Sequence, residues 1–281
     1  MKYFISLEFT KVTPKESELL NRSVVGGVVL FGKNILSYQT TKKFISEIKS
    51  INSDLKIGID EEGGLVSRIT HLLPSLSQPY CSTLTVSEVR EYYKKRSNFL
   101  RDLGIDLNFA PVVDISLDEN SYIYKRSYGS DINKIIELST TCIEEQRKAG
   151  LMSCIKHFPG HGRSTIDSHE KLPVLKISLR EWQNTEMKIF EHIIKKGVEY
   201  VMVGHLLFPK INKEVSSISP YWIKDILKNK LGFKGRVISD DLCMKGFRES
   251  AKDVSVGLME KAGIDDVIVT EQDHVLLKKL V

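Results

Sequence analysis

The 281-residue sequence predicts an α/β protein with parallel strands, and a single (β/α)8 barrel of the TIM type is the preferred architecture. Three observations support this prediction. Short runs rich in β-branched and aromatic residues alternate with segments of helical periodicity. Most of these runs are bounded by Gly, Asp or Pro, as strand ends often are. There are eight of them, which is the number that closes such a barrel.

The expected strands are spread along the whole chain. They comprise residues 3–7, 27–31, 55–59, 106–110, 152–157, 199–204, 235–239 and 265–269. An open, doubly wound sheet is the alternative, but the nucleotide-binding version of that sheet loses support because GxGxxG and GxxxxGK[ST] are both missing. No linker, low-complexity tract or short repeat interrupts the pattern. We therefore expect residues 1–281 to form one domain.

The first intervening helix has a complete start signal. In residues 13–22, Thr13 is the expected N-cap and Pro14 takes the first helical position. Glu16 follows Thr13 at the spacing of a capping box, so its side chain can reach back to the cap.

A second helix is expected to run without interruption over residues 178–197. Ser178 and Glu181 indicate its start, and Gly197 indicates its end. Apolar residues recur between them at roughly helical spacing; these are Trp182, Met187, Phe190, Ile193 and Ile194.

The composition is that of a soluble globular protein and excludes a membrane-inserted chain. Hydrophobic residues make up 41% and charged residues 27%, and no apolar run approaches the length that spans a bilayer. The 41 basic and 36 acidic residues are interspersed, giving a net charge of +5. Basic clusters such as residues 92–96 are better explained as solvated helix faces than as a nucleic-acid surface.

The N-terminus and the cysteines indicate the compartment. MKYFISLEFTKV lacks the apolar core and cleavage site of a signal peptide. The cysteines are scattered without a CxxC pair; they are Cys81, Cys142, Cys154 and Cys243. We expect reduced thiols and a cytoplasmic protein. The sequence does not specify an oligomeric state, and a monomer is the default expectation.

Ionisable residues follow five successive expected strands, and the active site of a (β/α)8 barrel lies at such strand ends. They are Asp60, Asp114, Lys156 with His157, His205, and Asp240 with Asp241. Each of these residues could instead have a non-catalytic role. Loop starts are often polar, and the two adjacent acids would suit the first turn of a helix. Together they favour an active-site rim, because unpaired charge near a core is costly.

Two segments could in principle bind a metal. The acidic run at residues 60–62 is followed by Gly63-Gly64, which instead predicts a tight turn that brings the backbone close to a ligand. In KHFPGHGRSTIDSHEKLP, residues 156–173, a proline and a glycine separate His157 from His161, so a helix cannot present both. Metal-dependent hydrolysis stays open as an alternative. We expect neither a metal nor a cofactor.

The same stretch contains a candidate proton-transfer pair. In an extended segment Asp167 and His169, two residues apart, would point to the same side. Asp167 could then hydrogen-bond one imidazole nitrogen and leave the other facing a substrate. A phosphate-binding loop is less consistent with this stretch, because Pro173 and the following VLKI do not open a helix.

Six segments in order along the chain carry a resemblance to a known family. They are IDEEGGLVSRI, LNFAPVVDI, KRSYG, KHFPGHGRSTIDSH, MVGHLLFP and GFKGRVISDDLCMKG. They resemble the bacterial β-N-acetylglucosaminidases of glycoside hydrolase family 3, from about residue 25 to 270. The resemblance implies a barrel fold and a retaining mechanism. It also implies that Asp240 is the nucleophile, His169 the general acid/base and Asp167 its partner.

The resemblance further implies which residues hold the hydroxyls and N-acetyl group of the terminal sugar. They are Asp60, Arg68, Arg126, Lys156 and His157. Cytoplasmic members of the family remove GlcNAc from 1,6-anhydro-muropeptides in cell-wall recycling, so a GlcNAc-containing muropeptide is the implied substrate. Leu65 and Glu61 depart from the family pattern, in which Arg and Gln are frequent at these positions.

Two other functions stay open at this point. One is phosphorolysis, because a neutral histidine repels an incoming phosphate less than a carboxylate would. The other is a catalytically silent sugar-binding protein on a barrel scaffold, which fold alone would permit.

Overall fold

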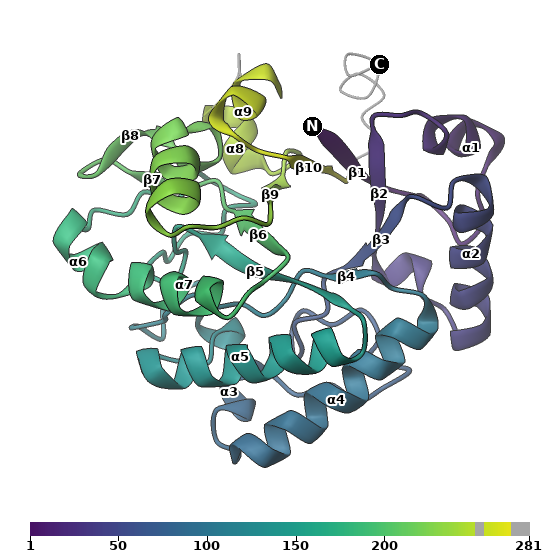
Figure 1. Ribbon diagram of the computed structural model, residues 1–281, viewed down its shortest axis with the longest axis horizontal. Helices are drawn as coiled ribbons and strands as arrows, with labels where there is room; N and C mark the ends of the chain where they lie inside the picture. Colours follow the sequence, from purple (N-terminus) through teal and green to yellow (C-terminus); the bar gives the residue numbers. More distant parts are fainter. Residues whose placement is uncertain (251–255, 271–281) are drawn as a thin grey trace.

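The computed structural model describes residues 1–250 and 256–270 as a closed barrel of eight parallel strands (Figure 1). The strand order around the barrel is β1-β10-β9-β6-β5-β4-β3-β2. Their bounds are β1 Lys2–Ser6, β2 Val25–Leu30, β3 Lys56–Ile59, β4 Leu107–Asn108, β5 Met152–Phe158, β6 Tyr200–Val203, β9 Arg236–Asp241 and β10 Asp266–Val269. All eight strands lie where the sequence predicts them, and the predicted fold class is confirmed.

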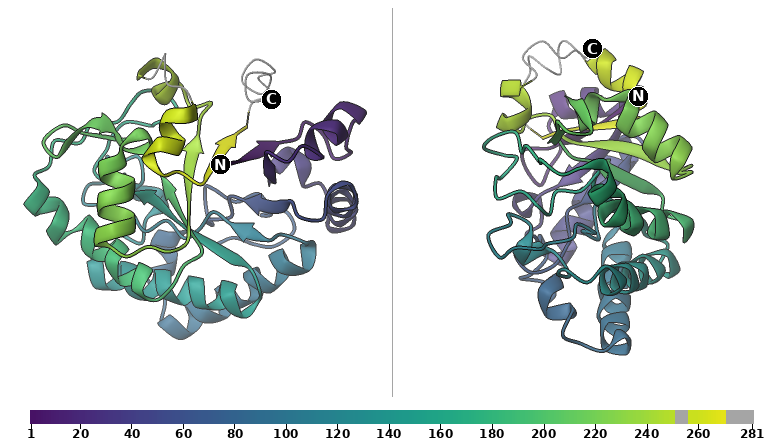
Figure 2. Two further views of the ribbon diagram at one scale, coloured as in Figure 1. Left: turned by 45° about the horizontal axis from the view of Figure 1, so that its top comes forward. Right: turned by 90° about the vertical axis from the view of Figure 1, so that its left-hand side faces the viewer.

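Helices surround the barrel and connect most successive strands (Figures 1 and 2). They are α1 Pro14–Leu20, α2 Tyr38–Ile51, α3 Gln78–Cys81, α4 Val86–Leu103, α5 Ile132–Lys148, α6 Leu179–Asn184, α7 Glu186–Lys195, α8 Lys245–Ser250 and α9 Val256–Ala262, with the shorter turns η1 Gly32–Asn34, η2 Tyr124–Arg126, η3 Ser216–Ile218 and the π-helical η4 Tyr221–Lys230. Figure 2 shows β1 beside β10, the pair that closes the barrel. Within the described ranges, helices that combine the length and apolarity needed to cross a bilayer are absent.

The start of α1 is as predicted. Thr13 is the N-cap and Pro14 opens the helix. The Thr13 side chain accepts a hydrogen bond from the Glu16 backbone N–H, and the Glu16 carboxylate accepts one from the Thr13 N–H at 2.8 Å. This reciprocal pair satisfies amides that would otherwise lack partners in the first turn.

The prediction of one helix over residues 178–197 is wrong, because the helix breaks at Thr185. The backbone there has φ −124° and ψ −90°, outside the helical region. Arg163, from the loop after β5, binds at the break. Its guanidinium donates to Glu181 Oε1 at 2.7 Å, Thr185 Oγ1 at 3.1 Å and Glu186 Oε1 at 2.5 Å. Helical periodicity persists on both sides, since Trp182 and Phe190 are both buried.

A short antiparallel hairpin follows β6 and was not predicted. It joins β7, Leu207–Phe208, to β8, Asn212–Val215. Its strands are too short, and too polar in β8, to show a two-residue periodicity.

Two apolar layers hold the barrel together. Strand residues that point inward form one cluster, which comprises Phe4, Val29, Leu107, Phe109, Cys154, Tyr200, Met202, Ile238 and Ile268. Side chains on the outer face of the strands pack with the helices in a larger cluster. Gly27 must lack a side chain, since a Cβ there would lie 2.4 Å from the Phe4 ring. The packed interior leaves the C-terminal ends of the strands for chemistry.

Candidate active site

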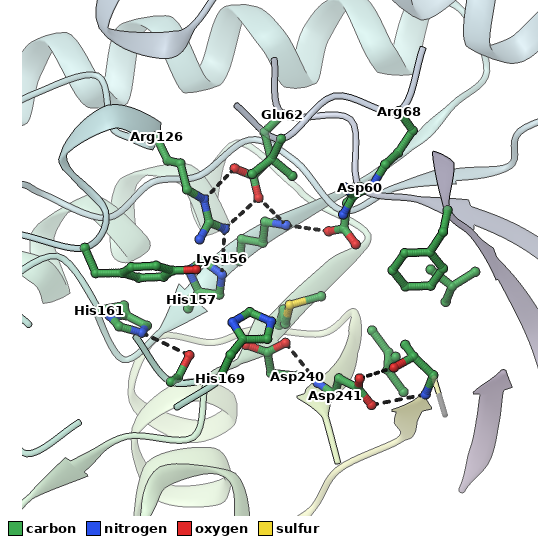
Figure 3. A pocket seen from close by; sticks show the side chains of 18 residues that line it. Asp60, Glu62, Arg68, Arg126, Lys156, His157, His161, His169, Asp240 and Asp241 are labelled. Atoms are coloured by element: carbon green, nitrogen blue, oxygen red, sulfur yellow. Dashed lines mark hydrogen bonds and ion pairs between the residues drawn. The ribbon is translucent and has the colours of Figure 1, made fainter. Parts of the chain in front are cut away.

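A cavity of about 150 Å³ opens at the C-terminal ends of the barrel strands (Figure 3). Its lining includes seven of the eight residues to which the family resemblance gives a role, namely Asp60, Arg68, Arg126, Lys156, His157, His169 and Asp240. Asp167 is absent from the lining but binds His169 directly. Glu62, Tyr122, His161 and Asp241 also line the cavity.

Lys156 and Arg126 share one buried carboxylate. Lys156 is at the end of β5, and its Nζ lies 2.6 Å from Asp60 Oδ1 and 2.7 Å from Glu62 Oε1. Arg126 binds Glu62 in bidentate fashion, through Nε at 2.8 Å and Nη2 at 2.7 Å. Burial alone would raise the pKa of Glu62, but the charges of Arg126 and Lys156 outweigh it and hold the pKa far below its usual range.

Arg68 differs from the other two cations because it has no ion pair among the described residues. Its guanidinium lies over the Phe31 ring, 5.5 Å from the ring centroid. Its Nε is buried without a hydrogen-bond partner in that part of the chain. Arg68 therefore retains donors for a ligand.

Asp114, which follows β4, holds the start of the loop after β5. Its Oδ2 lies 2.7 Å from His157 Nδ1 and accepts from the His157 N–H at 3.1 Å. Its Oδ1 accepts from the His161 N–H at 2.7 Å. Burial, and then the charge of His157, lower the pKa of His161 to about 4, so this imidazole is neutral at pH 7.

Asp240 at the end of β9 is partly buried and ionised. Burial raises the pKa of its carboxyl group, but the nearby His157 and His205 and the Asp241 N–H, which donates to Asp240 Oδ1 at 2.9 Å, lower it below the usual range. Asp241 also lines the cavity, but its carboxylate binds backbone groups of its own chain. Its Oδ1 accepts from the Cys243 N–H at 3.0 Å and the Thr270 N–H at 3.2 Å. Asp241 thus caps a turn, while Asp240 faces the cavity.

His205, predicted at the rim, is not part of the cavity lining, and its Nε2 lies 3.2 Å from the backbone oxygen of Asp241. Its Nδ1 is 2.7 Å from Ser217 Oγ, and its ring stacks on Phe247 with centroids 4.1 Å apart. Burial lowers the pKa of this imidazole. His205 is therefore a structural support for the end of β9.

Asp167 and His169 form the predicted pair, although by a different geometry. The segment is a turn and not an extended strand. Asp167 Oδ1 accepts from the His169 N–H at 2.8 Å and lies 2.8 Å from His169 Nδ1. His169 Nε2 is thus free to face a ligand, and the His169 side chain is 64% exposed.

The glycine turn after β3 is tight, as predicted, but it approaches the chain itself and not the cavity. Gly63 and Gly64 have φ of +103° and +60°. A Cβ on Gly63 would lie 2.2 Å from the backbone oxygen of Leu76. Across residues 1–248 and 256–270, groups of three or more His, Cys, Asp or Glu side chains with metal-binding arrangement are not found.

A sequence profile described as "Glycosyl hydrolase family 3 N terminal domain" matches residues 4–281. The chain belongs to glycosyl hydrolase family 3. The resemblance carried by the six sequence segments is confirmed.

Relatives within family 3 align with most of this chain. The beta-hexosaminidase of Haemophilus influenzae is 33% identical over 251 residues, which are 86% of this chain and 71% of the relative. That of Hydrogenovibrio crunogenus is 31% identical over 277 residues, 94% of this chain and 77% of the relative. Such relatives show that this family 3 chain is a glycoside hydrolase, a β-N-acetylhexosaminidase.

Solved family 3 structures have the same fold. Native NagZ from Neisseria gonorrhoeae has a TM-score of 0.89 at 28% identity, over 99% of this chain and 83% of that one. A β-N-acetylglucosaminidase from Paenibacillus sp. has a TM-score of 0.90 at 28% identity, again over 99% of this chain, which spans 56% of the Paenibacillus chain.

The two departures from the family 3 pattern lie outside the cavity lining. Leu65 is 70% exposed at the tip of the glycine turn. Glu61 is buried and lies 3.1 Å from Arg96 Nη1, in an ion pair whose side chains are 0% and 2% exposed. Its Oε2 also accepts from the Arg68 N–H at 2.7 Å, so this pair supports the segment that carries Arg68.

Proposed function

We propose that the protein hydrolyses terminal β-linked N-acetylglucosamine with retention of configuration, through a covalent intermediate on Asp240. The observation that carries this proposal is the presence of a partly buried, ionised Asp240 and a carboxylate-bound His169 in the lining of one cavity. Glycosidases generally use two carboxylates, so a histidine as the proton donor departs from that template.

In the first step, an Asp240 carboxylate oxygen attacks the anomeric carbon as the bond to the leaving oxygen breaks. Nε2–H of a protonated His169 gives its proton to that oxygen, which leaves as an alcohol. Asp167 stabilises the imidazolium, because it is ionised and bound at Nδ1. Asp240 can attack because its low pKa keeps it unprotonated at neutral pH.

In the second step, water attacks the anomeric carbon of the glycosyl-enzyme. Neutral His169 accepts a proton from the water at Nε2, and the ester bond to Asp240 breaks to restore the carboxylate. The sugar leaves with its original anomeric configuration, and both catalytic groups return to their starting protonation states.

We further propose that the sugar is held by Asp60, Arg68, Arg126, Lys156 and His157, which line the same cavity. A structure of NagZ from Neisseria gonorrhoeae in complex with N-trifluoroacetyl-D-glucosamine supports an amino sugar as ligand. The substrate proposed is a GlcNAc-containing muropeptide in the cytoplasm, as part of peptidoglycan recycling. Since every proposed group comes from one barrel, residues 1–281 would act as one catalytic domain and as a monomer.

Trapping the intermediate tests the assignment of Asp240. A fluorinated GlcNAc analogue that slows the second step should label Asp240, and Asp240→Ala should lose activity on an aryl β-GlcNAc by at least about a thousandfold. Label on Asp241 would refute the assignment. Analysis of products in phosphate buffer separates hydrolysis from phosphorolysis, since only the latter forms GlcNAc-1-phosphate.

A further inference from the structure

We propose that Tyr122 is a positioning residue for proton transfer, which it supports by holding the Asp167–His169 pair against the cavity through the Asp167 carboxylate. This inference rests on the proposed role of His169 as acid/base. Tyr122 stands outside the motifs that indicate the family, and no part of the mechanism above uses it.

The first observation is that the position of His169 depends on Asp167. With 64% of its side chain exposed, His169 has little packing of its own, and both its backbone N–H and its Nδ1 lie 2.8 Å from Asp167 Oδ1. The Tyr122 hydroxyl is close enough to the Asp167 carboxylate to help lower the pKa of Asp167 as a hydrogen-bond donor, and the bond to Asp167 in turn raises the pKa of Tyr122. Whatever fixes Asp167 therefore also fixes the proton donor.

The second observation is that Tyr122 belongs to a segment joined to the loop that carries the pair. The Tyr122 N–H donates to Ser164 O at 2.9 Å, and Ser121 Oγ donates to Gly162 O at 2.7 Å. A Cβ on Gly162 would lie 1.8 Å from Ile115 O, so the two segments are in direct backbone contact. The hydroxyl of Tyr122 is thus presented from a fixed base.

The third observation is that the ring of Tyr122 is fixed from two sides within the cavity lining. The guanidinium of Arg126 lies 5.6 Å from its centroid, and the His161 ring lies 5.6 Å away at an interplanar angle of 39°. His161 is itself bound through its backbone to Asp114, and its Nε2 is 3.3 Å from Ser168 Oγ, between the members of the pair. Tyr122 therefore joins the sugar-binding cation to the proton-transfer turn.

This role predicts an effect that depends on the leaving group. A poor leaving group, such as the second sugar of a GlcNAc disaccharide, needs full protonation by His169, whereas dinitrophenolate needs almost none. Tyr122→Phe keeps the ring and its packing and removes only the hydroxyl. We expect the loss in kcat/KM to be about tenfold larger for the disaccharide than for the dinitrophenyl glycoside. A loss of this size is expected when one hydrogen bond to a charged group is removed.

The experiment compares four proteins on both substrates: the wild type, Tyr122→Phe, His169→Ala and the double variant. Tyr124→Phe is the matched control, since this neighbouring tyrosine is outside the cavity lining and its hydroxyl is 3.5 Å from the exposed Glu119. If Tyr122 acts through the pair, Tyr122→Phe has no further effect on the disaccharide once His169 is removed. Thermal unfolding of each variant identifies any loss due to instability.

Equal losses by Tyr122→Phe on both substrates, or an additive loss in the double variant, would overturn the inference and leave the role of His169 intact. If His169→Ala itself showed no dependence on the leaving group, the proposed acid/base would be wrong, and the role of Tyr122 would be refuted with it.

Discussion

Replacing Glu62 by Gln removes one negative charge from between Arg126 and Lys156 while keeping the size of the side chain. The carboxylate has three charge-assisted contacts of 2.7–2.8 Å and is 1% exposed. Removing one partner of a buried ion pair costs roughly 3–5 kcal/mol, because the remaining charge is left uncompensated. Gln retains one acceptor oxygen, so we expect a loss in the free energy of unfolding at the lower end of this range, about 3 kcal/mol. For a domain of this size, that lowers Tm by about 6 °C.

The wild type and Glu62→Gln differ in their free energy of unfolding, and the pH dependence of that difference is a sharper test than its size at pH 7. The folded state holds the pKa of Glu62 far below 4.5, the ordinary value of a glutamate in an unfolded chain. A depressed folded pKa gives stability that is fully present above the unfolded pKa and is lost as the pH falls. The difference between the wild type and Glu62→Gln should therefore shrink by about 1.4 kcal/mol per pH unit below 4.5.

Urea unfolding of both proteins at pH 7, 5.5, 4.5 and 3.5 measures this difference directly. Other titrating groups are common to both proteins and cancel in it. Glu18→Gln is the control, because Glu18 is 77% exposed in a 3.8 Å pair with Arg22 and should change stability by less than about 0.5 kcal/mol. A Glu62→Gln difference that stays constant from pH 7 to 3.5 would refute the assignment of a buried, ionised Glu62.

Two further substitutions test the supports of the site. Arg96→Met should destabilise the protein by about 3–5 kcal/mol because it leaves Glu61 buried and unpaired, and the double variant Arg96→Met/Glu61→Gln, which removes the charge but keeps an acceptor for the Arg68 N–H, should recover part of this in the same urea assay. Failure of the double variant to recover would mean that the ion pair is not the source of the loss. Gly162→Ala should lower kcat on any β-GlcNAc substrate more than about tenfold, since its Cβ would lie 1.8 Å from Ile115 O and displace the loop that carries His169; wild-type kinetics would contradict this contact.

The barrel, and the presence of Asp240 and His169 in the cavity lining, could be predicted from sequence because the signals are local. Each strand is a compact β-rich run. Asp240 and His169 lie in contiguous motifs. Even there, the conformation at Asp167 was misjudged, because a spacing of two residues suits an extended strand and this turn equally well.

The pairing of the supporting residues could not be predicted in this way, because the partners are distant in sequence. Glu62 binds Arg126 across 64 residues, and Asp114 binds His157 across 43. In the chain these acids look like ordinary polar loop starts. The break at Thr185 was missed for the same reason, since the apolar periodicity continues through it and the cause is Arg163, 22 residues upstream.

The contacts of Arg163 also determine where the loop of the proton donor is anchored. One guanidinium binds three side chains at the helix break, and the Ser164 backbone is bound to Tyr122. The loop after β5 is therefore tied to the break between α6 and α7 only a few residues before Asp167. Neither helix lines the cavity, yet a substitution at the break that displaces Arg163 would also displace the turn that carries His169.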